Sequence, residues 1–352
     1  MFDWISDEAL VALVGLGGGV LLGLAARLGR FCTMGAIEDL LYGGSSLRMR
    51  MWVLAIGVAI MGTFSLSGLG VIELERSYYL SIEWMPLAMV LGGLMFGYGM
   101  ALAGNCGFGS IARLGGGDFR AFVIVIIMGV SAYAVLSGPL AFLRVQVFPQ
   151  SEVINTTPPG FAHLLHSWTG LPVAGLGVGI GAMVALGALA SGGMLAARKE
   201  IFWSVVVGVA ITSGWAGSYW VASQSFSPMP MVSHSFSAPV GEALLYAMTG
   251  SARAPSFAVG SVAGVALGAF IGSLIKGHFR WEACEDPREL RRQILGAVLM
   301  GAGAVLALGC TIGQGLSAFS MLAYSAPLVF AAIFAGAALG LRQLIEGFQP
   351  VE

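Results

Sequence analysis

The chain is built around long apolar runs, which constrain it more than any other feature. Nine such runs, most of them near the roughly 20 residues that a helix needs to cross a bilayer, alternate with more polar segments. Of the 352 residues, 57% are hydrophobic and 10% are charged, whereas a soluble domain carries about 25% charged residues. The sequence therefore predicts an all-α integral membrane protein with about nine transmembrane helices. The runs lie at 9–28, 51–70, 85–104, 121–141, 171–196, 201–221, 257–275, 294–309 and 325–345.

The basic residues divide the connecting loops into two sets. The loops at 71–84, 142–170 and 222–256 are poor in Lys and Arg. Cytoplasmic loops carry an excess of these residues, so the basic set is expected inside, with the N-terminus outside and the C-terminus cytoplasmic. The net charge of −1 gives no reason to expect a nucleic-acid partner. The basic set contains Arg48, Arg50, Arg113, Arg120, Arg198, Lys199 and the 276–292 segment.

Four glycine-rich or polar stretches interrupt the apolar pattern. Non-helical backbone at membrane depth is tolerated only where protein buries it or where it lines a polar path. In the expected topology two interruptions enter from each face, which predicts an inverted pseudo-repeat around an hourglass interior. The halves would be roughly 1–145 and 200–352, joined by a connecting helix at 171–196, in a single transmembrane domain, 1–352. The stretches read GRFCTMGAIEDL (29–40), GNCGFGSIARLGGGD (104–118), TSGWAGS (212–218) and GCTIGQGLSAFS (309–320).

Cysteines occupy three of the four interruptions. Cys32, Cys106 and Cys310 are each followed within three residues by a glycine, and glycine lets backbone approach a ligand closely. The free N–H groups at the start of a following short helix favour an anion. Apolar surroundings favour the neutral thiol, a soft donor, so the pattern predicts a sulfur-bearing anion rather than a hard oxyanion. The other candidate translocation residues are Gly35, Asn105, Gly107, Gly109, Thr311, Gly313, Gln314 and Gly315.

Several further residues have both a functional and a structural explanation. Trp215 takes the place of a cysteine in the third interruption, where it would wall the path or belong to an interfacial belt. Arg30 and Arg113 would form an anion vestibule or only anchor the topology. Cys284 lies in a charged loop and is expected to be a bystander thiol. The four cysteines form no CxxC pair and no cluster with histidine, so neither a metal site nor a cofactor is expected.

The interruptions resemble those of the YeeE/YedE family of sulfur-transport membrane proteins. The motifs are GRFCTMGAIEDL, GNCGFGSIARLGGGDFRA, FRWE and LMGAGAVLALGCTIGQGLS, and the resemblance covers nearly the whole chain. It implies a transporter rather than an enzyme, with nine membrane helices in the bacterial inner membrane. Thiosulfate would pass along Cys32, Cys106 and Cys310 by S–H···S hydrogen bonds. The implied partners are thiosulfate, the lipid bilayer and, as a candidate, a small cytosolic sulfur-carrier protein.

Two other functions stay open at this point. Relatives in this family are linked to other sulfur or selenium species, so a different ion is one alternative. A membrane sulfurtransferase or thiol redox protein is the other, and it requires one reactive, partly exposed cysteine beside basic residues. Cys32, close to Arg30, is the best candidate for that role, and a persulfide on Cys32 would reveal it.

Overall fold

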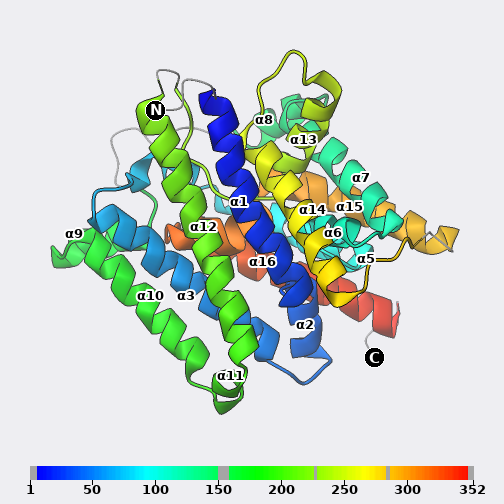
Figure 1. Cartoon of the computed structure of the whole chain (residues 1–352), viewed down its shortest axis with the longest axis horizontal. Coiled ribbons are helices and arrows are strands. Elements are labelled where there is room, and N and C mark those ends of the chain that lie inside the picture. The colour runs from blue at the N-terminus through cyan, green and yellow to red at the C-terminus, as the bar shows by residue number, and fades with distance from the viewer. Residues whose placement is uncertain (1–5, 150–157, 226–227, 283–285, 348–352) are drawn as a thin grey trace.

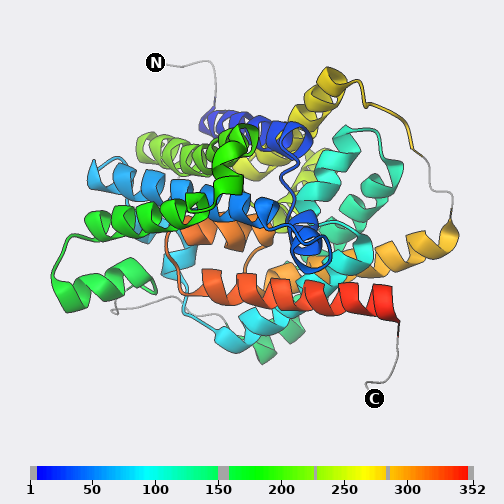
Figure 2. The same ribbon diagram turned by 90° about the horizontal axis from the view of Figure 1, so that it is seen from below.

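The computed structural model describes residues 6–149, 158–225, 228–282 and 286–347, where the chain is helical apart from loops and three isolated β-bridges. Helices α12, α1 and α14 lie side by side in Figure 1, and Figure 2 shows α16 on the opposite side of the body from α1. The elements are α1 (Asp7–Leu28), α2 (Thr33–Leu41), α3 (Leu47–Gly68), η1 (Leu74–Arg76), α4 (Tyr78–Ser81), α5 (Pro86–Ala103), α6 (Gly107–Gly115), α7 (Phe119–Leu136), α8 (Ala141–Val147), α9 (Phe161–Thr169), α10 (Val173–Leu189), α11 (Gly192–Ala196), α12 (Arg198–Gln224), α13 (Ala238–Thr249), α14 (Phe257–Lys276), α15 (Pro287–Leu306), η2 (Gly313–Ala318) and α16 (Ser325–Glu346).

The all-α membrane fold is confirmed. Seven helical stretches among the described residues are long and apolar enough to cross a membrane, and each coincides with a predicted run. The other two predicted runs correspond to α10, an apolar helix of 17 residues, and to α15, which begins with the charged sequence PRELRR. Nine crossings therefore remain a prediction, whereas seven have the length and composition that a membrane requires.

The third predicted interruption is wrong, because α12 runs unbroken through residues 212–218. The hydroxyls of Thr212 and Ser213 donate to the carbonyls of Gly208 and Ala210 within the same helix. The glycines there are packing positions, since a Cβ on Gly217 would lie 2.3 Å from a methyl carbon of a valine on α1. Non-helical backbone instead follows α12, where residues 228–237 lead into α13.

The packing of the two predicted halves is reciprocal. α1 packs on α14 and α12 packs on α3; α5 packs on α16 and α15 packs on α7. The short helices follow the same rule, because α2 contacts α3 as α13 contacts α14, and α6 contacts α7 as η2 contacts α16. The pairs α1 with α12 and α5 with α15 each join one helix to its counterpart, whereas α10, which lies between the two halves in sequence, packs on α3 of the first half. Apart from that of α10, these contacts match between the two predicted halves.

Glycine brings the long helices into backbone contact. On α1, a Cβ built on Gly19 would lie 2.4 Å from the Ser261 carbonyl oxygen of α14. On α14, a Cβ on Gly264 would lie 2.3 Å from the Leu16 carbonyl oxygen of α1. Small residues at such positions let membrane helices approach closely, which is their main source of association in lipid.

We expect Gly19→Val to destabilise the protein, because the added side chain meets backbone that cannot move aside. Overpacking of this kind costs about 1–3 kcal/mol. The matched control is Gly17→Val on the same helix, since a Cβ there would meet nothing within 4 Å. The apparent melting temperature of the purified protein in detergent should fall for Gly19→Val and stay unchanged for Gly17→Val. Equal shifts in the two variants would contradict this account of the α1–α14 contact.

Candidate functional site

Three helix breaks share one backbone pattern. After α1, α5 and α15 end, the chain turns through a left-handed residue, which is Arg30 (φ 54°), Gly104 (φ 74°) or Leu308 (φ 56°). A cysteine follows two residues later in every case, and a short helical segment begins directly after it. Arg30 and Leu308 adopt a conformation that costs a non-glycine residue about 1–3 kcal/mol, and such strain concentrates at functional sites.

Two of the three cysteines, Cys106 and Cys310, cap the helical segment that follows them. The N–H of Gly109 donates to Cys106 Sγ at 3.3 Å, and that of Gly313 donates to Cys310 Sγ at 3.5 Å. Cys310 Sγ also accepts from the N–H of Phe236 at 3.2 Å. At Cys32 the Met34 and Gly35 amides face the sulfur without the geometry of a cap hydrogen bond. These contacts engage sulfur lone pairs and leave the S–H of each cap free to donate.

The glycine three residues after each cysteine makes room for a polar side chain. A Cβ on Gly35 would lie 2.4 Å from Arg48 Nη1, and one on Gly109 would lie 2.8 Å from Asn105 Oδ1. A Cβ on Gly313 would lie 2.8 Å from the hydroxyl oxygen of Ser235. Each of these glycines therefore has a polar neighbour that the methyl group of alanine would displace. Arg48 also forms an ion pair with Asp39 on α2, at 3.2 Å.

The three cysteines lie in sequence through the protein, and together they are called the thiol line. Cys32 Sγ is 3.5 Å from Asn105 Oδ1, and the Cys32 and Cys106 thiols are direct neighbours. Cys106 in turn neighbours the side chain of Thr311, which follows Cys310. Cys106 and Cys310 are 0% and 1% exposed, whereas Cys32 is partly exposed. The thiol line therefore has a buried centre and two ends.

A cavity of about 570 Å³, called the main cavity, lies at the Cys310 end. Trp215 is 1% exposed and donates from Nε1 to Ser320 Oγ at 2.9 Å, so it is a buried wall of this cavity and not part of an interfacial belt. The segment 228–237 forms much of the lining and supplies residues that the sequence did not single out. The polar and aromatic lining includes Tyr78, Tyr79, Arg144, Trp215, Ser233, Ser235, Ser237 and Glu242.

Buried polar atoms without partners gather around the thiol line. Within the described chain, Thr33 Oγ1 and Thr311 Oγ1 are fully buried without a hydrogen bond, and each follows a cysteine directly. Ser110 Oγ on α6 and Gln314 Oε1 on η2 share this condition. Native interiors rarely leave buried polar atoms unpaired, so these atoms are candidates for contact with a polar solute.

The remaining predicted residues take structural positions. Gln314 Nε2 donates to the carbonyls of Ala307 and Leu308 at 2.9 and 3.2 Å, which fixes the break after α15. A Cβ on Gly107 would lie 2.8 Å from the side chain of Met128. A Cβ on Gly315 would lie 2.9 Å from an aromatic ring on α16. The two glycines are therefore close-packing positions, whereas Asn105 and Thr311 lie at the thiols.

Unpaired arginines lie at the Cys32 end. Arg113 is near both Cys32 and Arg27. The Arg27 Nε donates to Ser273 Oγ at 2.7 Å, which holds that guanidinium in place. Arg30 and Arg113 are exposed, and neither forms an ion pair within the described ranges. Positive charge thus marks this end of the thiol line.

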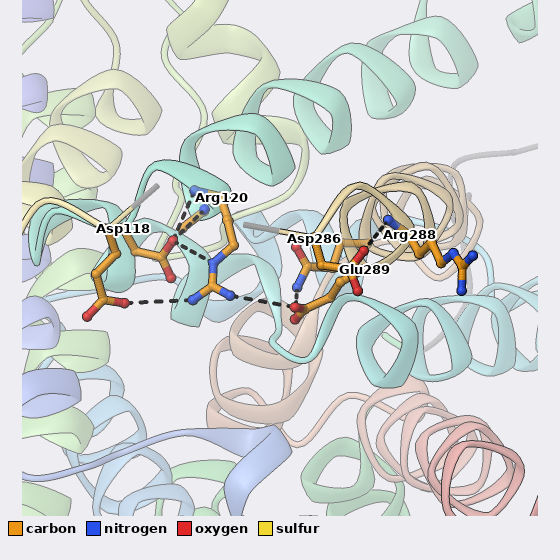
Figure 3. A network of polar contacts seen from close by, with 8 residues as sticks. Asp118, Arg120, Asp286, Arg288 and Glu289 are labelled. Atoms are coloured by element: carbon orange, nitrogen blue, oxygen red, sulfur yellow. Dashed lines mark hydrogen bonds and ion pairs between the residues drawn. The ribbon is translucent and has the colours of Figure 1, made fainter. Parts of the chain in front are cut away.

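Arg120 has a different role, because three carboxylates surround it (Figure 3). Its guanidinium lies 3.4 Å from Asp118, 3.7 Å from Glu282 and 3.7 Å from Glu289. The backbone of Glu282 is bonded to the same region, since the Phe119 N–H donates to its carbonyl at 3.0 Å. Arg120 therefore joins α7, α15 and the loop between α14 and α15. Cys284, the expected bystander in that loop, lies outside the described residues.

Comparisons with known proteins identify the family. The sulphur-transport family matches residues 28–339. The thiosulfate transporter TsuA of Escherichia coli (strain K12) is 27% identical over 324 residues, which are 89% of this chain and 88% of that protein. The thiosulfate transporter TsuA of Spirochaeta thermophila is 26% identical over 321 residues, 87% of this chain and 91% of that protein. The probable transporter YedE of Salmonella typhimurium is 33% identical over 95 residues, 27% of this chain and 22% of that protein. The chain therefore belongs to the sulphur-transport (YeeE/YedE) family, whose members are transporters rather than enzymes.

Proposed function

We propose that this protein imports thiosulfate along the thiol line. The observation that carries the proposal is the repeated cap, in which a sulfur lies at a helix break with its S–H left to donate. Two relatives that align with most of the chain are thiosulfate transporters, which supports the same substrate. The main cavity lies at one end of the thiol line, and exposed arginines lie at the other.

The chemistry of thiosulfate fits neutral thiols. Its terminal sulfur is soft and negatively charged, and a thiol is a soft, weak donor that can meet it in an S–H···S contact. The first N–H groups of α2, α6 and the segment that starts at Thr311 add partial positive charge near each thiol. Three weak donors in succession would let the ion pass from one to the next without being held tightly.

We propose the bacterial inner membrane as the location, with the main cavity outside and the arginines in the cytoplasm. The start of α1, α8 and α13 lie toward one end of the body in Figure 1, and α2 and α11 lie toward the other. The loops near α2 and α11 carry basic residues, which favours the cytoplasm for that end. The reciprocal packing supports an inverted pseudo-repeat of 1–145 and 200–352 around an hourglass interior.

The cytoplasmic end would also receive any partner. Arg30 and Arg113 have no ion pair within the described ranges, which suits either the departing dianion or an acidic protein surface. A small sulfur-carrier protein is the partner proposed there. Co-purification of such a protein with the native chain, and its loss on Arg113→Glu, would support that assignment.

The function is tested by growth of a bacterium that lacks its own thiosulfate uptake, with thiosulfate as sole sulfur source. The native chain should restore growth, and sulfate-fed cultures control for general fitness. Competition by sulfate, sulfite and selenite then measures selectivity. No growth from a chain that is present in the membrane would overturn thiosulfate import, and growth inhibition by selenite would identify the broader substrate class.

A further inference from the structure

Two hydroxyl groups meet at the floor of the main cavity, beside Cys310. A Cβ built on Gly313 would lie 2.8 Å from Ser235 Oγ and 3.2 Å from the Tyr79 hydroxyl oxygen, so both oxygens border one small space. Ser235 Oγ is also 3.7 Å from Cys310 Sγ. Both side chains line the main cavity and are only partly buried. A solute in the cavity therefore meets these hydroxyls before it reaches the thiol.

The fold leaves these hydroxyls available to bind a solute. Among the residues that the structure describes, Ser235 Oγ has a hydrogen-bond contact only with Cys310 Sγ, and the Tyr79 hydroxyl has no hydrogen-bond partner. Ser237, which is 1% exposed, lines the same cavity, and its Oγ is buried without a partner. An unpaired buried hydroxyl costs free energy that a ligand with acceptor oxygens would recover.

The reciprocal packing gives Ser235 a counterpart. Cys106 and Cys310 correspond, because each precedes a short helical segment and accepts from a glycine N–H three residues later. Cys32, ahead of α2, borders Cys106, and Ser235, ahead of α13, borders Cys310. Ser235 therefore lies against Cys310 as Cys32 lies against Cys106, with a hydroxyl instead of a thiol, while Ser237 is the residue directly before α13, as Cys32 is directly before α2.

We propose that Ser235, Tyr79 and Ser237 bind the oxygen end of thiosulfate, so that its terminal sulfur faces Cys310. Hydroxyls suit the hard sulfonate oxygens, and the thiol suits the soft sulfur. Burial raises the pKa of Tyr79, so its phenol keeps its proton and acts as a donor. The two kinds of donor orient the ion at the entrance to the thiol line. The assignment rests on the proposed function, and the site is where thiosulfate would bind first on its way to the thiol line.

The test compares two variants with two matched controls. Ser235→Ala and Tyr79→Phe should each raise the thiosulfate concentration for half-maximal uptake about tenfold, as expected for one lost hydrogen bond to a charged ligand. The maximal rate should change little. Ser233→Ala and Tyr78→Phe, which line the same cavity, should match the native chain. Ser233 Oγ already donates to the Ile211 carbonyl at 2.8 Å, and the hydroxyl beside Gly313 is that of Tyr79 and not that of Tyr78. Ser235→Thr should restore most of the affinity.

Binding of radiolabelled thiosulfate to the purified chain in detergent provides the second readout. Weaker binding by Ser235→Ala and Tyr79→Phe, with gel-filtration profiles like the native one, supports the site. Native half-saturation in both variants, or a fall in maximal rate alone, overturns the site while leaving thiosulfate import intact. Absence of both binding and uptake by the native chain overturns the proposed function itself, so the two failures are distinguishable.

Discussion

Cys106→Ala is expected to reduce thiosulfate uptake by about 10–100-fold, the loss that follows from removing one buried donor to a charged solute. Cys106 is fully buried and lies between Cys32 and Thr311, so no neighbouring thiol can replace it. The protein should still fold, because the change removes one sulfur atom and, from the helix end, only the Gly109 N–H hydrogen bond. Uptake by Cys106→Ser should be nearly as low, since a serine hydroxyl is a hard donor and its C–O bond is shorter than the C–S bond of cysteine.

Initial rates of radiolabelled thiosulfate uptake, at matched membrane expression, provide the measurement. Cys32→Ala and Cys310→Ala extend the test to both ends of the thiol line. Cys284→Ala is the control, because that thiol belongs to the charged loop and not to an interruption. Uptake at the native rate by both Cys106 variants would remove the thiols from the path, even if the chain proved to carry thiosulfate.

The positions of the three thiols could be predicted because local sequence sets them. A glycine-rich break at the end of an apolar run is costly in lipid, so a cysteine in such a break is expected to lie in a functional segment. The structure adds the left-handed turn two residues earlier and the cap to the glycine three residues later. Those details depend on backbone geometry. In the sequence, the recurring C-x-x-G spacing is the one sign of that geometry.

The second half of the site could not be read in the same way. The segment 228–237 looks like an ordinary external loop, yet tertiary packing places it against Cys310 and the main cavity. One signal was present, since no Asp, Glu, Lys or Arg occurs between Glu200 and Glu242. A loop at the membrane surface would be expected to carry charge. The small polar residues of α12 do not break the helix, because Ser and Thr hydroxyls in a helix can donate to carbonyls of the preceding turn.

Gln314 shows a different limit of the sequence. Its amide was predicted to contact the substrate. A long polar side chain in an interruption is equally consistent with binding a substrate and with bonding to the backbone. In the fold its Nε2 bonds to two carbonyls of the helix end that precedes Cys310. A side chain seven residues from its acceptor can be assigned to the backbone or to the ligand only when the turn between them is known.

Gly109→Ala and Gly313→Ala are expected to cut uptake by about tenfold or more without destabilising the protein. Alanine favours a helix over glycine by about 1 kcal/mol, so stability should hold or rise. The new Cβ, however, would lie 2.8 Å from Asn105 Oδ1 in the first variant and 2.8 Å from Ser235 Oγ in the second. Each polar side chain must then move away from its thiol, since Asn105 is bonded to Cys32 and Ser235 contacts Cys310.

The control for these variants is Gly17→Ala, where the added methyl meets nothing within 4 Å. Melting temperature and uptake are measured on the same preparations, so that a folding defect is separated from a blocked path. A variant that melts at or above the native temperature but carries little thiosulfate would show that the space beside each thiol matters. If Asn105→Ala combined with Gly109→Ala transports better than Gly109→Ala alone, the displaced amide is the obstruction. Native uptake in both glycine variants would mean that the polar neighbours of the thiols take no part in passage, and the thiols alone would have to guide the ion.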